Sequence, residues 1–141
     1  MFFQNPTTAI CNIIYNLDLK PGDEVLLTDH EYGALVRAWN AWGEKTKVHI
    51  KYANVTLPLE SKDKFFEDIQ KKISPKTKVL FLSQITSPTG LIFPIKDIIK
   101  FAKQRGIITI VDGAHVPGHI DLNIHKLGCD FYTGALHKWM C

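Results

Sequence analysis

Short apolar runs alternate with amphipathic segments along this 141-residue chain, and the alternation limits the fold more than any other feature. The apolar runs are rich in β-branched residues, which is typical of strands buried in a parallel sheet. We expect strands at residues 24–28, 47–52, 77–83, 107–111 and 130–132, and a strand end at 2–4. We expect helices from Pro6 or Thr7 to 17, and at 34–44, 61–73 and 95–105. This order predicts a three-layer α/β/α fold with a mainly parallel central sheet.

Composition excludes several classes of protein. Hydrophobic residues make up 45% and charged residues 22%, as in ordinary globular domains. A net charge of +3 is too small to predict a nucleic-acid or acidic-membrane partner. No apolar run approaches the length of a membrane span, and no secretory signal begins the chain. Three cysteines without zinc-type spacing (Cys11, Cys129 and Cys141) predict free thiols, no metal site and a cytoplasmic setting.

Chemically active side chains follow the last two expected strands. Asp112 ends the first of them, His115 follows three residues later, and His137-Lys138 come after the second. Carboxyl ends of parallel strands share one edge of a sheet, where ligands bind. A lysine amine can form an imine with pyridoxal phosphate, and an aspartate can keep the pyridine nitrogen protonated. Alone, Asp112 would be a turn residue and Lys138 a surface charge, but their joint occurrence favours a pyridoxal-phosphate site.

The runs Asp112-Gly-Ala-His115, Asp-Phe-Tyr-Thr133-Gly and His137-Lys138-Trp closely resemble the class V aminotransferase family. This branch of fold type I pyridoxal-phosphate enzymes includes cysteine desulfurases and isopenicillin N epimerase-like proteins. The resemblance implies that Lys138 forms the internal imine and then moves the substrate α-proton, while Asp112 pairs with the pyridine nitrogen. It also implies that His115, the third expected catalytic residue, hydrogen-bonds the phenolic oxygen of the cofactor. His137 and Thr133 would contact the phosphate region.

Two further segments match the family. Thr7 and Thr8 open a helix and resemble the segment that binds the cofactor phosphate, because a helix N-terminus attracts anions. Without the resemblance, plain helix capping would explain both threonines. In the family, an aromatic ring after the strand at 24–28 stacks on the pyridine ring, and both His30 and Tyr32 are candidates here.

Thr86 and Ser87 lie in a polar loop after residue 83 that resembles the family loop over the cofactor, where substrate also binds. The alternative is an ordinary turn, since the loop is rich in turn-forming residues.

The resemblance implies a pyridoxal-phosphate-dependent enzyme that acts on an amino acid as a homodimer. Transamination, desulfuration, other C–S cleavage and epimerisation share their early steps, so the reaction stays open. Family members are much longer, so we expect residues 1–141 to be part of the cofactor-binding large domain, without an N-terminal segment and the C-terminal small domain. The alternative is a catalytically inactive truncated fragment or a non-enzymatic binding module.

Other sites are disfavoured. No Gly-x-Gly-x-x-Gly indicates a Rossmann nucleotide site, and no Gly-x-Ser-x-Gly indicates a hydrolase. A metal site at Asp112, His115 and His119 is disfavoured because Pro117 interrupts the set.

Overall fold

The computed structural model describes residues 1–140. The elements are α1 (Pro6–Tyr15), β1 (Glu24–Thr28), α2 (Gly33–Thr46), β2 (His49–Ala53), α3 (Lys62–Lys72), β3 (Thr77–Ser83), α4 (Ile95–Lys103), β4 (Ile108–Gly113), α5 (Ile124–Leu127), β5 (Phe131–Gly134) and α6 (Leu136–Trp139). The strands form one sheet in the order β2-β1-β3-β4-β5, and every pairing is parallel. The predicted α/β fold with a parallel sheet is therefore confirmed.

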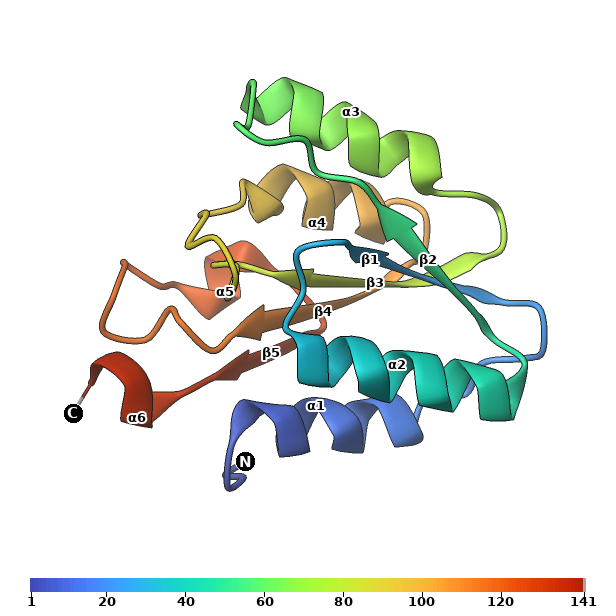
Figure 1. The fold of residues 1–141 in the computed structure, drawn as a ribbon, viewed down its shortest axis with the longest axis horizontal. Helices are drawn as coiled ribbons and strands as arrows, with labels where there is room; N and C mark the ends of the chain where they lie inside the picture. The colour runs from blue at the N-terminus through green and yellow to red at the C-terminus, as the bar shows by residue number, and fades with distance from the viewer. Residues whose placement is uncertain (141) are drawn as a thin grey trace.

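Helices cover both faces of this sheet (Figure 1). On one face, α1 and α2 pack on Val25, Leu27 and Phe81, around the buried ring of Trp39. On the other face, α3 and α4 pack on alternate residues of the same strands, among them Leu26. Successive strand residues point to opposite faces, so two apolar layers need nearly continuous apolar strands. The three layers follow directly from that pattern. Among the described residues, no helix is long and apolar enough to span a membrane.

The strand order reverses direction between β1 and β3. The chain leaves β1 through α2 to β2 on one side, and it returns through α3 to β3 on the other side of β1. In open parallel sheets, ligands bind outside the carboxyl ends of the strands at such a switch point. The carboxyl ends of β1 and β3 therefore mark the place for a binding site.

Element boundaries agree with the sequence for two of the three interior strands and differ for the other strands. β1 and β3 have the predicted bounds, whereas β2, β4 and β5 each begin one or two residues later than predicted. Residues 2–4 were predicted to end a strand, and this is wrong, because they form no strand and Phe2 is 95% exposed. The short helices α5 and α6 were not predicted, since a single turn shows no periodicity.

Candidate functional site

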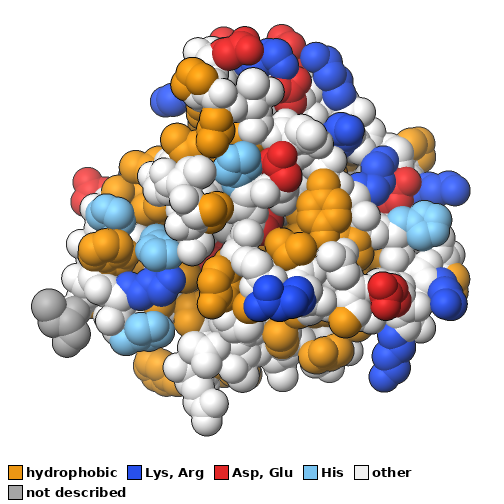
Figure 2. All heavy atoms as spheres, in the orientation of Figure 1, with side chains coloured by type: hydrophobic (Ala, Val, Ile, Leu, Met, Phe, Trp, Pro, Cys, Tyr) orange, Lys and Arg blue, Asp and Glu red, His pale blue; other side chains and the backbone are white. Residues whose placement is uncertain are grey.

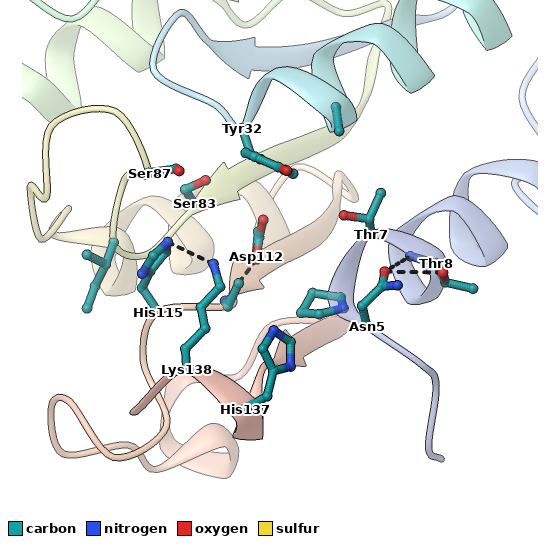
Figure 3. Close-up of a pocket in the computed structure, with 14 residues that line it drawn as sticks. Asn5, Thr7, Thr8, Tyr32, Ser83, Ser87, Asp112, His115, His137 and Lys138 are labelled. Carbon is teal, nitrogen blue, oxygen red and sulfur yellow. Dashed lines mark hydrogen bonds between the residues drawn. The ribbon is translucent and has the colours of Figure 1, made fainter. Parts of the chain in front are cut away.

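A cavity of about 450 Å³ lies at the carboxyl end of the sheet. Its walls come from the start of α1, the turn after β1, the ends of β3 and β4, and α6 (Figure 3). The volume is in the range of small-ligand sites. The predicted site residues that line it are Thr7, Thr8, Tyr32, Ser87, Asp112, His115, His137 and Lys138. Figure 2 shows several histidine side chains around a basic side chain near the C-terminal end of the chain.

Lys138 and His115 meet across the cavity wall. Lys138 lies in α6, and its Nζ is 2.9 Å from Nε2 of His115, which follows β4 (Figure 3). Lysine has only donors, so the ring nitrogen accepts this bond. Partial burial lowers the pKa of His115, and the charges of Lys138 and His119 lower it further. His115 is thus kept neutral and holds the lysine nitrogen in place.

Asp112 supplies a buried carboxylate. Asp112 lies at the end of β4 and is 5% exposed. Its Oδ1 accepts a 2.8 Å hydrogen bond from the backbone N–H of Ala114. Burial raises the pKa of Asp112, while the Ala114 N–H and the charge of Lys138 act in the opposite direction. A carboxylate out of water is stabilised by a charged donor. The site therefore suits a protonated group beside Asp112.

The start of α1 forms another wall. Asn5 caps the helix, because its Oδ1 accepts from the backbone N–H of Thr8 at 2.8 Å and from Thr8 Oγ1 at 3.1 Å (Figure 3). Pro6 occupies the first helical position, where no N–H is needed. Thr8 is thus engaged in the cap, while Thr7 lines the cavity beside the positive end of the helix.

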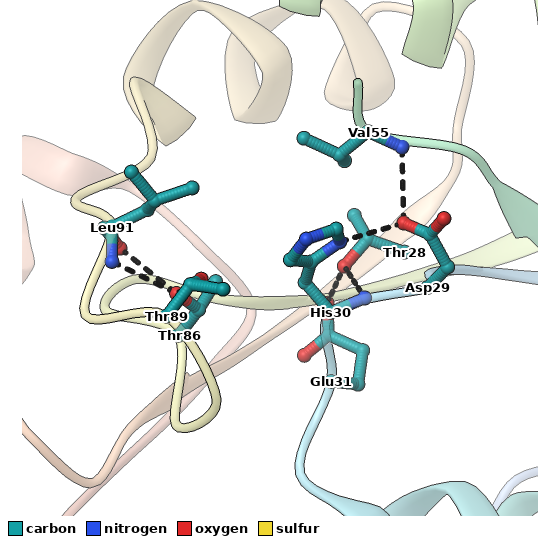
Figure 4. Close-up of polar contacts among 8 residues, drawn as sticks. All are labelled: Thr28, Asp29, His30, Glu31, Val55, Thr86, Thr89 and Leu91. Atoms are coloured by element: carbon teal, nitrogen blue, oxygen red, sulfur yellow. Dashed lines mark hydrogen bonds and ion pairs between the residues drawn. The ribbon is translucent and has the colours of Figure 1, made fainter. Parts of the chain in front are cut away.

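Tyr32 rather than His30 lines the cavity. Nδ1 of His30 lies 2.8 Å from Oδ1 of Asp29, which also accepts from the backbone N–H of Val55 at 2.9 Å (Figure 4). These contacts join the end of β1 to the chain beyond β2. His30 therefore serves the loop structure, and Tyr32 is the aromatic ring within reach of a ligand.

Two other predicted residues lie apart from this cavity. Thr86 is buried in its own turn, where Oγ1 contacts Thr89 Oγ1 at 2.7 Å and accepts from the N–H of Leu91 at 2.9 Å (Figure 4). Thr133 pairs with Asp112 in the sheet but lines a second cavity, of about 750 Å³, along β5. Within the described residues its buried Oγ1 has no hydrogen-bond partner. His137 lines both cavities.

Three polar residues at or behind the cavity wall were not predicted as site residues. Asn5 and Ser83 line the cavity, and Ser83 is the register partner of Asp112. Glu31 is buried behind Ser83 and bonds to it. Ser83 could have been predicted as a site residue, because it is a polar residue that ends a buried strand, as Asp112 does.

Comparison with known proteins finds one family over the whole chain. The family model for aminotransferase class V matches residues 1–141. The isopenicillin N epimerase of Amycolatopsis lactamdurans is 36% identical over 99% of this chain and 36% of its own length. A probable cysteine desulfurase of Halalkalibacterium halodurans is 31% identical over 98% of this chain and 34% of its own length.

Solved structures agree with this result. A variant of C-DES, with glycine covalently linked to its pyridoxal-phosphate cofactor, matches with a TM-score of 0.89 and 26% identity over 97% of this chain and 36% of that chain. The Escherichia coli cysteine desulfurase CsdA matches with a TM-score of 0.80 and 26% identity over 94% of this chain and 33% of that chain. The chain thus spans about a third of the length of the curated relatives it matches.

Proposed function

The chain belongs to the aminotransferase class-V family, and from this premise we propose that it carries the cofactor-binding part of a pyridoxal-phosphate-dependent enzyme that acts on an amino acid. The observation that carries the proposal is the meeting of Lys138, His115 and Asp112 at one cavity (Figure 3). An amine, an acceptor that orients it and a buried carboxylate are the groups that an aldehyde-bearing pyridine requires. The proposed active protein is a cytoplasmic homodimer.

The donor set of the cavity fits pyridoxal phosphate. Thr7 and the start of α1 would hold the phosphate, and Tyr32 would cover the ring. Asp112 would accept from the protonated ring nitrogen, which also offsets the cost of its burial. When bound, the cofactor supplies an electron sink for charge that develops at the substrate α-carbon.

The protein's own groups then have defined tasks. Lys138 Nζ would bind the cofactor aldehyde and later carry the α-proton of the substrate. His115 orients that nitrogen through the 2.9 Å contact and stays neutral because its pKa is lowered. His137 and Ser87, at the rim, would contact the phosphate and the substrate respectively.

The proposed substrate class is small amino acids. Epimerisation, C–S cleavage and transamination can all begin with removal of the α-proton, and two of the relatives above are named as an epimerase and a cysteine desulfurase. Of the cysteines in residues 1–140, neither Cys11 nor Cys129 lines the cavity. Our proposal therefore stops at chemistry on the α-carbon of an amino acid.

The test is chemical labelling. The purified protein is mixed with pyridoxal phosphate, reduced with borohydride and digested, and the modified peptide is identified by mass spectrometry. We expect the label on the peptide that contains Lys138, and loss of both the label and the visible absorbance in Lys138→Ala. Lys126→Ala, a change in nearby α5, is the matched control and should keep both signals. A label on another lysine, or none, would contradict the proposal.

A further inference from the structure

Glu31 is a buried carboxylate that the proposed chemistry does not use. It lies in the turn between β1 and α2 and is 5% exposed. Its Oε1 accepts from Thr28 Oγ1 at 2.5 Å, and its Oε2 accepts from the N–H of Ser83 at 2.9 Å and from Ser83 Oγ (Figure 4 shows the Thr28 contact). Burial of a carboxylate is costly without such donors. An arrangement with three donors indicates a site built to hold this group.

The position of Glu31 relates it to the cavity. Its contacts cross from the end of β1 to the end of β3, which is the switch point of the sheet. Ser83 is the register partner of Asp112, and both residues line the cavity. Glu31 therefore stands directly behind the part of the wall that carries Asp112.

The hydrogen bonds determine what Ser83 can offer to a ligand. A serine hydroxyl has one proton and two lone pairs. Ser83 gives its proton to Glu31, so only lone pairs remain for the cavity. The ionised carboxylate of Asp112 is also an acceptor only. This stretch of wall thus accepts hydrogen bonds and favours a ligand atom that carries a proton.

The negative charge of the neighbouring carboxylates also favours a protonated ligand atom. The side chains that face Glu31 are Thr28 of β1, Ser83 of β3 and Asp112 of β4, and Asp112 is the charged one among them. Burial, together with repulsion by Asp112, raises the pKa of Glu31 to about 7, against the lowering effect of its hydrogen bonds. Two buried carboxylates, one in the turn after β1 and one at the end of β4, are relieved by a cation in the cavity.

We propose that Glu31 is a positioning residue of the cofactor site, which holds Ser83 as an acceptor beside Asp112 and adds negative charge, so that the ring nitrogen of the bound cofactor stays protonated. The inference rests on the proposed function, since the ring is that of pyridoxal phosphate. Glu31 does not line the cavity. It would act on the ring through its hydrogen bonds to Ser83 and through the electrostatic field of its carboxylate.

The first test measures the ring itself. Pyridoxamine 5′-phosphate has no aldehyde and so binds without a bond to Lys138. With the ring nitrogen labelled with ¹⁵N, its NMR shift reports protonation as the pH is raised. We expect Glu31→Gln to lower the titration midpoint of the bound ring by about one pH unit, the usual size of a nearby-charge effect. Ser83→Ala, which removes the acceptor hydroxyl and leaves the Glu31 carboxyl in place, should also lower the midpoint.

Glu24→Gln is the matched control. Glu24 lies at the opposite end of β1, and its carboxylate also accepts from two hydroxyls, those of Ser74 and Thr77. Loss of its charge should leave the midpoint of the bound ring unchanged. Equal midpoints in wild type, Glu31→Gln and Ser83→Ala would overturn the inference, and so would an equal shift in Glu24→Gln.

A second readout needs no ligand. The amide proton of Ser83 donates to Glu31, so its NMR shift should titrate with a midpoint near the Glu31 pKa of about 7 and should lose this transition in Glu31→Gln. A flat Ser83 amide in the wild type would overturn the Glu31 contact. If that amide titrates but the wild type binds no pyridoxamine 5′-phosphate, the proposed function fails and the cofactor role of Glu31 fails with it.

Discussion

Asp112 illustrates how one atom of a side chain can serve the fold and another the ligand. Its Oδ1 is occupied by the N–H of Ala114. Asparagine in this position can keep that contact through its own oxygen. Replacement by asparagine therefore changes the charge and leaves the turn intact, which makes the site testable without loss of structure.

We predict that Asp112→Asn binds pyridoxal phosphate about 10- to 100-fold more weakly, because a charge-assisted hydrogen bond contributes about 1.5–3 kcal/mol. Equilibrium titration of cofactor absorbance measures this, with the surface variant Asp121→Asn as control. Equal affinity for pyridoxal phosphate in wild type and Asp112→Asn would show that Asp112 serves only the structure of the turn.

Glu31 should make stability depend on pH. Its folded pKa of about 7 lies above its ordinary value of 4.5, so the folded state binds the proton more tightly. The resulting stability is full below about pH 4.5 and is lost as pH rises to about 7, a change on the order of 3 kcal/mol. We predict that Glu31→Gln gains stability relative to wild type over this window. Urea unfolding at both ends of the window checks it, and a constant difference would contradict it.

The proximity of side chains was predictable where polar residues follow a strand end. Asp112, His115 and Lys138 were expected together because parallel strands end at one edge, and the structure brings them to one cavity. Glu31 was missed because its partner Ser83 is 52 residues away, and local patterns carry no information at that distance. His30 and Tyr32 could not be separated, since only the direction of the turn decides which ring enters the cavity.

At the scale of elements, the ends of helices do as much for the site as the strands. Asn5 caps α1 and Ser61 caps α3, each by accepting a backbone N–H three residues on. α1 begins at the cavity, whereas α3 lies on the other face of the sheet (Figure 1). The two caps are thus alike in structure and different in their relation to the site.

We predict that Asn5→Ala and Ser61→Ala each cost about 1 kcal/mol of unfolding free energy, the usual value of a cap. Only Asn5→Ala should also weaken cofactor binding, because the start of α1 supplies the proposed phosphate contacts. Thermal unfolding and cofactor titration of both variants check this. Similar cofactor affinity in the two variants would argue against a phosphate site at α1.

Element boundaries were predicted correctly for two of the three interior strands, whereas β4, the third, begins one residue and ends two residues later than predicted. β1 and β3 lie at the centre of the sheet and have nearly continuous apolar runs, so their predicted bounds are correct. β2 and β5 are its edge strands and are partly exposed. The difference in hydrophobicity between strand and loop, which marks a strand end, is therefore weaker there.

At the scale of the whole molecule, β5 is an edge strand of the sheet formed by residues 1–140. Phe131 of this strand is 41% exposed, and the larger cavity of about 750 Å³ beside it is lined by Phe2, Phe3 and Ile13. An edge strand with apolar neighbours favours pairing with another chain. Association between copies should therefore begin on this side.

We predict that the 141-residue chain self-associates as its concentration rises, and that Phe131→Lys reduces this association by placing a charge on the edge strand. Sedimentation velocity measures it. Leu57→Lys, at a residue of similar exposure outside the sheet, is the control and should associate like wild type. A wild type that stays monomeric would contradict the prediction.

The walls of the smaller cavity are contributed by residues from Asn5 to Lys138, which lie almost the whole chain apart. On the ribosome, the wall at Asn5 is made before the wall at Lys138, which needs β5 and α6 to have emerged. A small molecule cannot be captured before that moment, and its capture then stabilises all intervening elements together, by about 2.7 kcal/mol at a hundred times its dissociation constant. Ligand present during synthesis would thus raise the fraction of newly made chain that is folded.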